Sequence, residues 1–268
     1  VSRSLDALEH QLGFNLIVKS SRQLGLTEAG ATYLPKVERL LLDFDDATAS
    51  AKGMHSEARG QLNIHARMAV GTICIAPLLP GFLARYPEID VRLSLDNETD
   101  INLIQENIHV DIRTGVLQDS SLIVRKLADS KRVIVASEHY VDTFGVPETP
   151  EDLLNHNCLT FRNTPAIVQW HFRSADGEHY AIAPKGNLET DNGAVIRHCL
   201  RRGVGIGHMT DWAVAEDLRD GTLIRLLEDY EVTVDQFHHG IYAIFTPSRN
   251  QSAKVRAFID YLVGAFRD

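Results

Sequence analysis

The sequence predicts an α/β body that follows a small helical head and one long helix. The chain has 268 residues, enough for one large or two modest domains, and 44% of them are hydrophobic, so a sizeable core is available. From residue 60 onward, apolar patterns of period two alternate with patterns of helical period. Before residue 60, apolar residues recur at heptad spacing. Together these patterns predict a head, a connecting helix and an α/β domain.

The head is expected to be a helix followed by a small hairpin. Val1, Leu5, Leu8 and Leu12 are spaced as one face of a helix, and Gly13 is suited to end it. The apolar stretches 14–18 and 24–26 then flank a polar, basic turn, which predicts a β-hairpin. An ordinary helix–loop fragment is the alternative interpretation.

A long helix is predicted from residue 28 to about residue 57. Thr27 can cap it, and Glu28 suits its first turn. Its apolar seam has 3-4 spacing and consists of Leu34, Val37, Leu41, Phe44, Thr48 and Ala51. A helix of about 30 residues is about 45 Å long. The head cannot cover that length, so pairing with a second copy is expected, with packing on its own chain as the alternative. Pro35 predicts a kink.

In the body, the predicted strands are 62–66, 89–95, 109–113, 133–136, 204–208 and 241–245. The predicted helices are 70–85, 99–107, 192–202, 211–219 and 252–266, the first of them broken near Pro77 or Pro80. Asp176-Gly177 lies between two strand-like runs and predicts a hairpin. The strand–helix–strand order predicts a largely parallel sheet with right-handed crossovers.

Charge is distributed unevenly along the chain. The net charge is −9, yet residues 1–27 carry +1, residues 28–57 carry −3, and the rest carries −7. A near-neutral head can bind DNA beside an acidic body, because charges beyond about 10 Å are screened at ordinary salt. The three cysteines, Cys74, Cys158 and Cys199, are far apart, which argues against a disulfide framework and fits a reducing cytoplasm. The sequence contains no run of about 18 apolar residues, so no transmembrane helix is expected.

Motifs for cofactors, metals and catalysis are missing from the sequence. The glycines at 203, 205 and 207 have the wrong spacing for a dinucleotide loop and follow a helix instead of a strand. There is no HExxH, CxxC or G-x-S-x-G pattern. We therefore expect no cofactor and no metal, and we do not expect an enzyme. A triad assembled from distant residues stays open.

The candidate ligand residues lie where strands end and helices begin, which is where α/β sheets bind ligands. Arg113, together with Arg67, could balance a carboxylate. Ordinary loop capping is the alternative role for each residue. The candidate effector-binding residues are Met68, Ala69, Thr72, Asn97, Arg113, Gly115, Asp191, Asn192, His208 and Thr210.

Several stretches resemble the LysR-type transcriptional regulators, over essentially the whole chain. Residues 1–13 resemble the recognition helix of that family's winged helix-turn-helix, and Leu26-Thr27-Glu28-Ala29-Gly30 resembles its step into the linker helix. The latter motif is the most specific. The body from Gly60 resembles the effector-binding domain, on the stretches 76–82, 85–88, 119–127 and 254–260.

The resemblance implies a division of the chain. Residues 1–27 would be a partial winged helix-turn-helix that lacks about 30 residues of the family pattern, and 28–58 would be a linker and dimerisation helix. Residues 59–268 would form two α/β lobes like those of periplasmic binding proteins. Lobe 1 would comprise about 59–135 and 237–268, and lobe 2 about 136–236.

The resemblance also implies a cytoplasmic DNA-binding regulator, controlled by a small-molecule effector, expected to be an organic acid, between the lobes. The implied partners are double-stranded operator DNA, the effector and a second copy in a homodimer or homotetramer. RNA polymerase is a candidate partner, and no membrane is involved. The alternative is a solute-binding module without DNA binding. The DNA-binding candidates are Ser2, Arg3, Ser4, Lys19 and Arg22.

Overall fold

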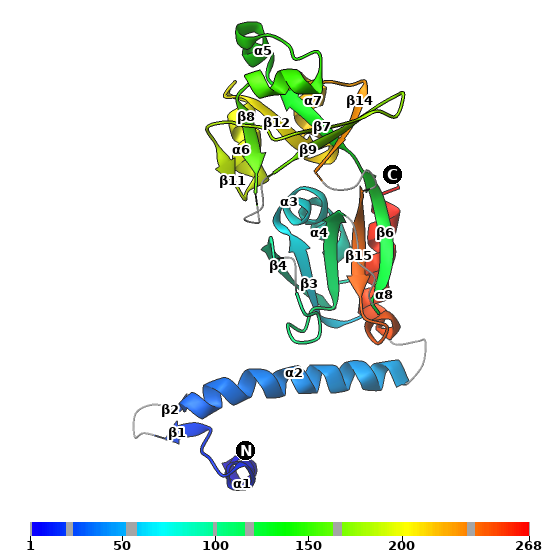
Figure 1. Ribbon diagram of the computed structural model, residues 1–268. Helices are drawn as coiled ribbons and strands as arrows, with labels where there is room; N and C mark the ends of the chain where they lie inside the picture. The colour runs from blue at the N-terminus through cyan, green and yellow to red at the C-terminus, as the bar shows by residue number, and fades with distance from the viewer. Residues whose placement is uncertain are drawn as a thin grey trace. The chain divides into compact units, whose positions relative to one another are not determined.

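The computed structural model describes residues 2–19, 24–51, 58–98, 101–115, 121–162, 168–234 and 239–267 (Figure 1). The chain divides into two compact units, Val1–Glu57 and Ala58–Asp268. The tip of the predicted hairpin, 20–23, and the predicted end of the long helix, 52–57, lie outside the described residues.

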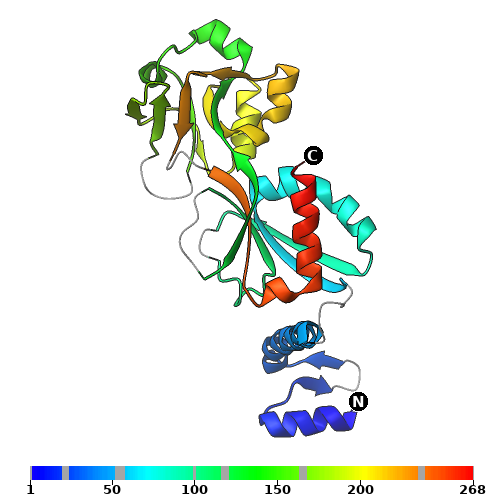
Figure 2. The same ribbon diagram turned by 90° about the vertical axis from the view of Figure 1, so that its right-hand side faces the viewer.

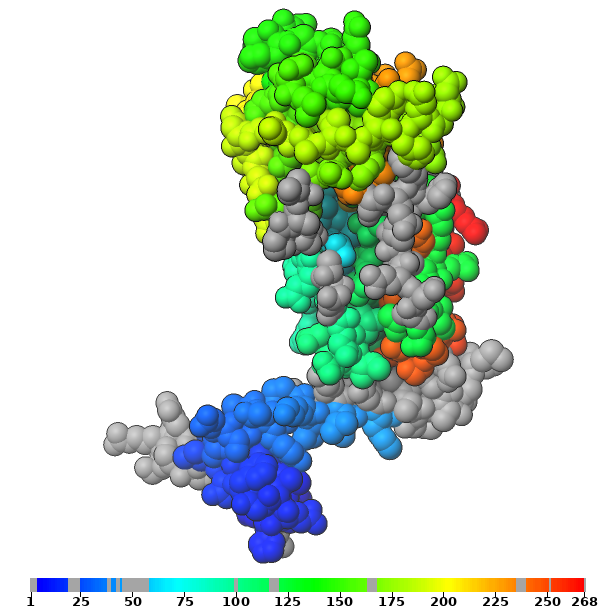
Figure 3. Space-filling view, in the orientation of Figure 1, coloured from blue at the N-terminus to red at the C-terminus, as the bar shows by residue number. Residues whose placement is uncertain are grey.

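The first unit contains the predicted helix, hairpin and long helix. Helix α1 (Ser2–Leu12) ends at Gly13, whose φ of +77° suits glycine. Strands β1 (Ile17–Lys19) and β2 (Leu24–Leu26) pair antiparallel, which confirms the hairpin. Helix α2 (Glu28–Ala51) extends well beyond that hairpin (Figure 3).

The Leu26–Gly30 motif has a packing explanation. Thr27 Oγ1 accepts a hydrogen bond from Gly30 N at 2.9 Å, as an N-cap does, and donates one to Asn15 O at 2.7 Å. A Cβ atom at position 30 would lie 2.1 Å from the backbone oxygen of Leu16. Thr27 and Gly30 therefore seat the first turn of α2 directly on the backbone before β1.

The first lobe of the second unit is built on a five-stranded mixed sheet. Its order is β4-β3-β5-β15-β6, in which β3 is parallel to β4 and β5, while β15 is antiparallel to β5 and β6. The expectation of a largely parallel sheet is therefore wrong, because β15 runs opposite to the other four strands and both of its pairings are antiparallel. The strands are β3 (Gly60–Arg67), β4 (Ile89–Asp96), β5 (Val110–Gly115), β6 (Ile123–Ser130) and β15 (His239–Phe245).

One face of this sheet carries helix α8 (Ala253–Ala265) and a helical run from Met68 to Arg85 (Figure 2). Leu62, Ile64 and Ala66 of β3 point into the core beneath these helices. The run comprises α3 (Met68–Val70), a π-helical segment (Gly71–Ile75), a 3-10 segment (Ala76–Leu78) and α4 (Leu79–Arg85). The irregular turns precede and include Pro77, where a break was expected.

Contrary to the sequence-based expectation, the run Met68–Arg85 is long and apolar enough to cross a membrane by length and composition. Its packing indicates a core helix of the lobe instead. Val70, Ile75 and Phe82 are completely buried against the sheet, and the Phe82 ring lies 5.1 Å from that of Phe258 on α8.

The second lobe is a mixed sheet of order β10-β9-β14-β7-β12-β8-β11, with β13 also paired to β7. Gly177, at φ +85°, turns the predicted β9–β10 hairpin. Hydrophobic clusters around Trp170 and around Ile196 cover the two faces. The strands are β7 (Arg132–Ala136), β8 (Cys158–Phe161), β9 (Trp170–Ser174), β10 (His179–Ile182), β11 (Glu189–Thr190), β12 (Ile206–Thr210), β13 (Ile224–Leu226) and β14 (Tyr230–Thr233). The helices are α5 (Glu138–Phe144), α6 (Gly193–Leu200) and α7 (Ala215–Asp220), with 3-10 turns at Pro150–Asn155, Asp211–Ala213 and, in the first lobe, Arg249–Gln251.

The chain passes from the first sheet to the second at Lys131, between β6 and β7. This crossover lies four residues before the expected position, 135, and the return segment includes 235–238, outside the described residues. Strand β6 was not predicted as a strand. The helix expected at 99–107 is not formed by its described part, where 103–107 are turns.

Candidate functional site

Charged residues gather on the sheet face of the first lobe that points away from α8. Strand alternation sends Leu62, Ile64 and Ala66 toward the helices, so the side chains of His65 and Arg67 leave from the opposite face. The register places Asp111 of β5 beside His65, and Asp96 of β4 beside Arg67. Four charged or titratable side chains thus meet where β3 and β4 end and where β5 begins.

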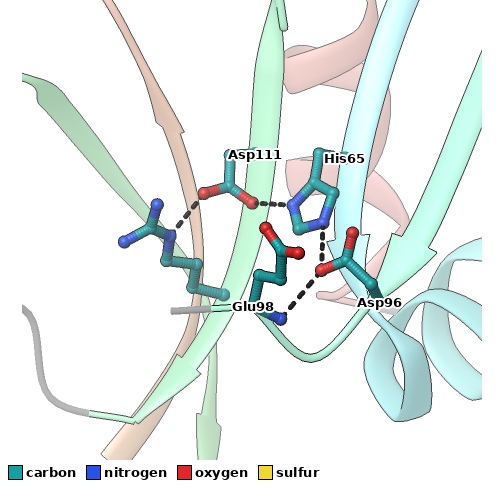
Figure 4. Close-up of polar contacts among 5 residues, drawn as sticks. His65, Asp96, Glu98 and Asp111 are labelled. Carbon is teal, nitrogen blue, oxygen red and sulfur yellow. Dashed lines mark hydrogen bonds and ion pairs between the residues drawn. The ribbon is translucent and has the colours of Figure 1, made fainter. Parts of the chain in front are cut away.

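His65 lies between two carboxylates (Figure 4). Its Nδ1 is 2.8 Å from Asp111 Oδ1, and its Nε2 is 3.0 Å from Asp96 Oδ1. Asp111 is completely buried and also accepts a hydrogen bond from Arg113 Nε. The same oxygen of Asp96 accepts a hydrogen bond from Glu98 N at 2.9 Å. A continuous polar chain therefore runs from Arg113 to the turn after β4.

The carboxylates determine the protonation of this histidine. Burial by itself lowers the pKa of His65, but the hydrogen bond and charge of Asp111, followed by those of Asp96, outweigh burial and raise the pKa above its ordinary value of 6.5. The two carboxylates therefore favour the charged imidazolium more than water does.

Arg67 provides a second cation beside this chain. Its Nε atom is buried and has no hydrogen-bond partner among the described residues. Burial and the neighbouring charge of Arg113 lower the pKa of Arg67, against the opposing influence of Asp111 and Asp96. Two guanidinium groups close enough to repel each other form a favourable place for an anion, since a guanidinium donates in a fork that matches carboxylate geometry.

Four of the predicted effector residues make contacts between the lobes. Asn97 Nδ2, in the turn after β4, donates to the backbone oxygen of Asp191 at 2.9 Å. Asn192 Nδ2 lies 3.8 Å from Met68 Sδ, and Asn192 Oδ1 caps α6 by accepting from Ala194 N. Met68 and Asn97 of the first lobe therefore meet Asp191 and Asn192 of the second.

Ala69, Thr72 and Gly115 lie near this contact in sequence. Ala69 and Thr72 are exposed on the first turns of the Met68–Arg85 run. Gly115 ends β5 at φ +108°, two residues beyond Arg113. These positions fit a ligand-lining role, and their roles stay predictions.

His208 and Thr210 occupy a more enclosed position than a ligand-lining role suggests. Both are buried on β12, and the His208 ring lies 5.6 Å from that of Trp170. Thr210 pairs with Arg132 at the start of β7, next to the crossover. His208 therefore packs within the second lobe, and Thr210 belongs to the strand end nearest the crossover.

The DNA-binding candidates lie in the first unit. Ser4 is exposed on α1, Ser2 and Arg3 belong to the first turn of the same helix, and Lys19 ends β1. Arg22 lies outside the described residues. The backbone therefore places the three N-terminal candidates on one helix end, while their roles stay predictions.

Sequence reasoning missed His65, Asp96 and Asp111 as a cluster. The signal in the sequence was a charged residue within an otherwise apolar strand, such as Asp111 between Val110 and Ile112. Pairing them required knowing that β3 lies between β4 and β5.

The cysteines and the potential metal ligands are a further set of candidate functional groups. Cys158 is buried, and burial raises the pKa of its thiol to about 12. The pKa of the Cys74 thiol is also raised to about 12, by burial and, to a smaller extent, by the charge of Asp211. All three cysteines are free thiols. Within the described ranges, no group of three or more His, Cys, Asp or Glu residues is arranged to hold a metal ion.

Comparisons with known proteins agree with this architecture. The family model described as the LysR substrate binding domain matches residues 55–267. The HTH-type transcriptional regulator CrgA of Neisseria meningitidis serogroup C (strain 8013) is 35% identical over 264 residues, which cover 98% of this chain and 86% of CrgA. The solved structure of CrgA from Neisseria meningitidis, a LysR-type regulator, superposes with a TM-score of 0.70 at 32% identity, covering 100% of this chain and 89% of that one. The full-length structure of the Vibrio cholerae virulence activator AphB has a TM-score of 0.69 at 29% identity, covering 98% and 88%.

Proposed function

Because the chain belongs to the LysR-type family of transcriptional regulators, we propose that its first unit binds operator DNA and that an organic-acid effector binds between its two lobes. Regulators of this family bind DNA and small-molecule effectors and form oligomers. The protein is a regulator and not an enzyme. The alternative of a solute-binding module without DNA binding is not retained, since the relatives that span 98% of the chain are regulators.

For DNA recognition, we propose that the N-terminal end of α1 enters the major groove, as recognition helices do. Arg3 would meet guanine or phosphate, and Ser2 and Ser4 would meet phosphate or base edges. Lys19 and Arg22, at the hairpin, would contact phosphate.

Replacing Arg3 with alanine is expected to weaken operator binding by about 1–3 kcal/mol and to relax base preference at one position, because a bidentate base contact is lost. Binding should be measured by titration of the full-length protein with operator and with single-base variants at fixed salt. Arg85→Ala, in the second unit, is the matched control. Unchanged affinity and selectivity would exclude a base-reading role for Arg3.

We propose that α2 couples two copies in a homodimer or homotetramer. Among the side chains of this helix that the structure describes, four large apolar ones are exposed: Leu34, Leu40, Leu41 and Phe44. Leu34, Leu41 and Phe44 belong to the heptad seam, and an exposed apolar seam of this length is typical of a helix with a partner. We place the protein in the cytoplasm, where operator DNA lies, with RNA polymerase as a further partner.

The observation that supports an acidic effector is the pair of cations beside the contact between the lobes. Arg67 and Arg113 repel each other, and the buried Nε of Arg67 has no partner among the described residues. A carboxylate placed against both guanidinium groups would supply the missing acceptor. Closure of the lobes around it would then bias DNA binding, a coupling typically worth about 1–3 kcal/mol.

Arg67→Gln is expected to lower the affinity for the acid by roughly tenfold or more, since a hydrogen bond to a charged group is lost. The free energy of unfolding of Arg67→Gln should fall by no more than about 0.5 kcal/mol, and it can increase, because the surroundings disfavour the charge of Arg67. The test is thermal stabilisation of the full-length protein by a panel of mono- and dicarboxylic acids, with the corresponding neutral amides alongside.

Arg92→Gln, at an exposed position of β4, removes the same charge outside the site and serves as the control. At least one acid should stabilise the parent protein and Arg92→Gln but not Arg67→Gln. Equal stabilisation by an acid and its amide, or by an acid in the parent and in Arg67→Gln, would contradict an anionic effector at this place.

A further inference from the structure

The surroundings of His65 impose a condition on its hydrogen atoms. A neutral imidazole carries one N–H donor and one acceptor nitrogen. Here both nitrogens face carboxylate oxygens, at 2.8 Å to Asp111 and 3.0 Å to Asp96, and neither ionised carboxylate can donate. Both contacts can be hydrogen bonds at the same time only when the ring is a doubly protonated imidazolium. With both carboxylates ionised, the geometry therefore assigns a proton to each nitrogen.

The two carboxylates differ in their freedom to respond when that proton leaves. Asp111 is fully buried and is also held by Arg113, whereas the side chain of Asp96 is 44% exposed. A neutral His65 can keep its donor on Asp111, and its bare Nε2 then repels Asp96. Loss of the proton therefore acts mainly on Asp96, at the end of β4.

Asp96 is joined to the contact between the lobes by the next residue in the chain. Its Oδ1 accepts hydrogen bonds from both His65 Nε2 and Glu98 N, which fixes the turn that holds Asn97 (Figure 4). Asn97 Nδ2 donates to the backbone oxygen of Asp191 in the second lobe, at 2.9 Å. Displacing Asp96 would release this turn and, with it, the side chain that contacts the other lobe.

We propose that His65 is a proton-dependent positioning residue: its imidazolium holds Asp96 and thereby keeps Asn97 against Asp191, so that the contact between the lobes weakens when His65 loses a proton. The link to regulation rests on the proposed effector site, because the same contact lines it. Proton loss and effector binding then act on one contact, and the protein responds to pH as well as to its ligand.

The charged groups around His65 agree with this direction. From β4 and its following turn it meets Asp96, with Glu98 nearby, and from β5 it meets Asp111, with Arg113 behind it. On its own strand, Arg67 is the nearest cation. His109, just before β5, accepts a hydrogen bond from Asn63 N through its Nδ1 at 2.9 Å. The pKa of His65 is raised above 6.5, so the contact is held at pH 6 and is lost as the pH rises through that raised pKa.

The test measures, in the full chain, the protonation of the His65 ring and the stability of the turn that Asp96 holds. Histidine-selective ¹⁵N labelling, with the His65 signal identified by its loss in His65→Gln, reports whether both ring nitrogens are protonated at pH 7. Hydrogen exchange between pH 5.5 and 9.5, corrected for the intrinsic pH dependence, reports the protection of Glu98 N–H. We expect a doubly protonated ring at pH 7 and a fall in protection by roughly tenfold or more above the His65 pKa, the usual size for a lost hydrogen bond to a charged group.

Three variants make the outcome specific. In His65→Gln, protection at Glu98 should be low and no longer follow this titration. In Asp96→Asn, which keeps the shape of a partly exposed side chain, the His65 titration should move to lower pH. His198→Gln, an exposed histidine on α6, should behave as the parent protein. A singly protonated His65 at pH 7, or the same pH dependence in His65→Gln and the parent, would overturn the proposal. Neither readout uses effector or DNA, so failure here is separate from failure of the proposed function.

Discussion

Asp111→Ala is expected to lower the free energy of unfolding by about 3–5 kcal/mol, because it removes one member of a buried charge cluster and leaves the others without their partner. Asp111 is completely buried and holds both His65 Nδ1 and Arg113 Nε. Alanine also leaves a small cavity between β3 and β5. Urea unfolding at pH 7, followed by circular dichroism, gives the change directly.

The matched control is Asp129→Ala, in the same lobe. Asp129 forms an ion pair with Lys126 on the surface, where its side chain is 81% exposed. A surface pair is worth about 0–1 kcal/mol, so this variant should unfold almost as the parent does. Equal effects of the two substitutions would show that the buried cluster contributes no more than a surface pair, contrary to the geometry described here.

Gly30→Ala is expected to destabilise the first unit by about 1–3 kcal/mol and to impair DNA binding, because the new methyl group has no space. Its Cβ would lie 2.1 Å from the backbone oxygen of Leu16, and a backbone atom cannot turn aside as a side chain can. Either α2 or the segment before β1 must move. The proposed DNA-contacting residues of α1 and the hairpin would then lose their common framework.

Gly25→Ala tests the same chemical change where there is room. Nothing lies within 4 Å of a Cβ built at Gly25, in strand β2 of the same unit. Operator affinity and protease resistance of the first unit should fall in Gly30→Ala and stay near the parent values in Gly25→Ala. A Gly30→Ala protein with unchanged affinity and resistance would contradict the packing explanation of the Leu26–Gly30 motif.

Local elements of the fold could be predicted because their signals are local. The spacing of Leu5, Leu8 and Leu12 gives α1, and alternation over 62–66 gives β3. Asp176-Gly177 marks the β9–β10 hairpin, and Thr27 marks the start of α2 through a hydrogen bond that spans three residues. Each of these features depends on residues that lie close together in the sequence.

The arrangement of the strands could not be obtained in this way. Strand β15 pairs with β5 and β6, and about 110 residues separate it from the nearer of them along the chain, so no local pattern reveals its antiparallel direction. The crossover at Lys131 joins β6 directly to β7. No glycine or proline there marks the boundary between the two lobes in the sequence. The turns at 103–107 replaced a predicted helix because Leu103 and Ile108 pack on Ile244 of β15.

The candidate site was predicted in part for the same reason. The rule that ligands bind beyond strand ends selected Met68, Asn97, Asp191 and Asn192, which make the contacts between the lobes. It could not select His65, because a single histidine within a strand has no distinguishing pattern. Only the strand pairing makes it part of a charged cluster, because it sets His65 beside Asp111 and lets its Nε2 reach Asp96 Oδ1 at 3.0 Å.

The most direct test of the account is selection of bound duplexes from random DNA by the full-length protein, at a low and a near-physiological salt concentration. A LysR-type regulator with a paired α2 is expected to select a two-fold symmetric site whose binding survives the higher salt. Binding that has no sequence preference, and that is lost steeply as salt rises, would contradict specific DNA recognition by this protein.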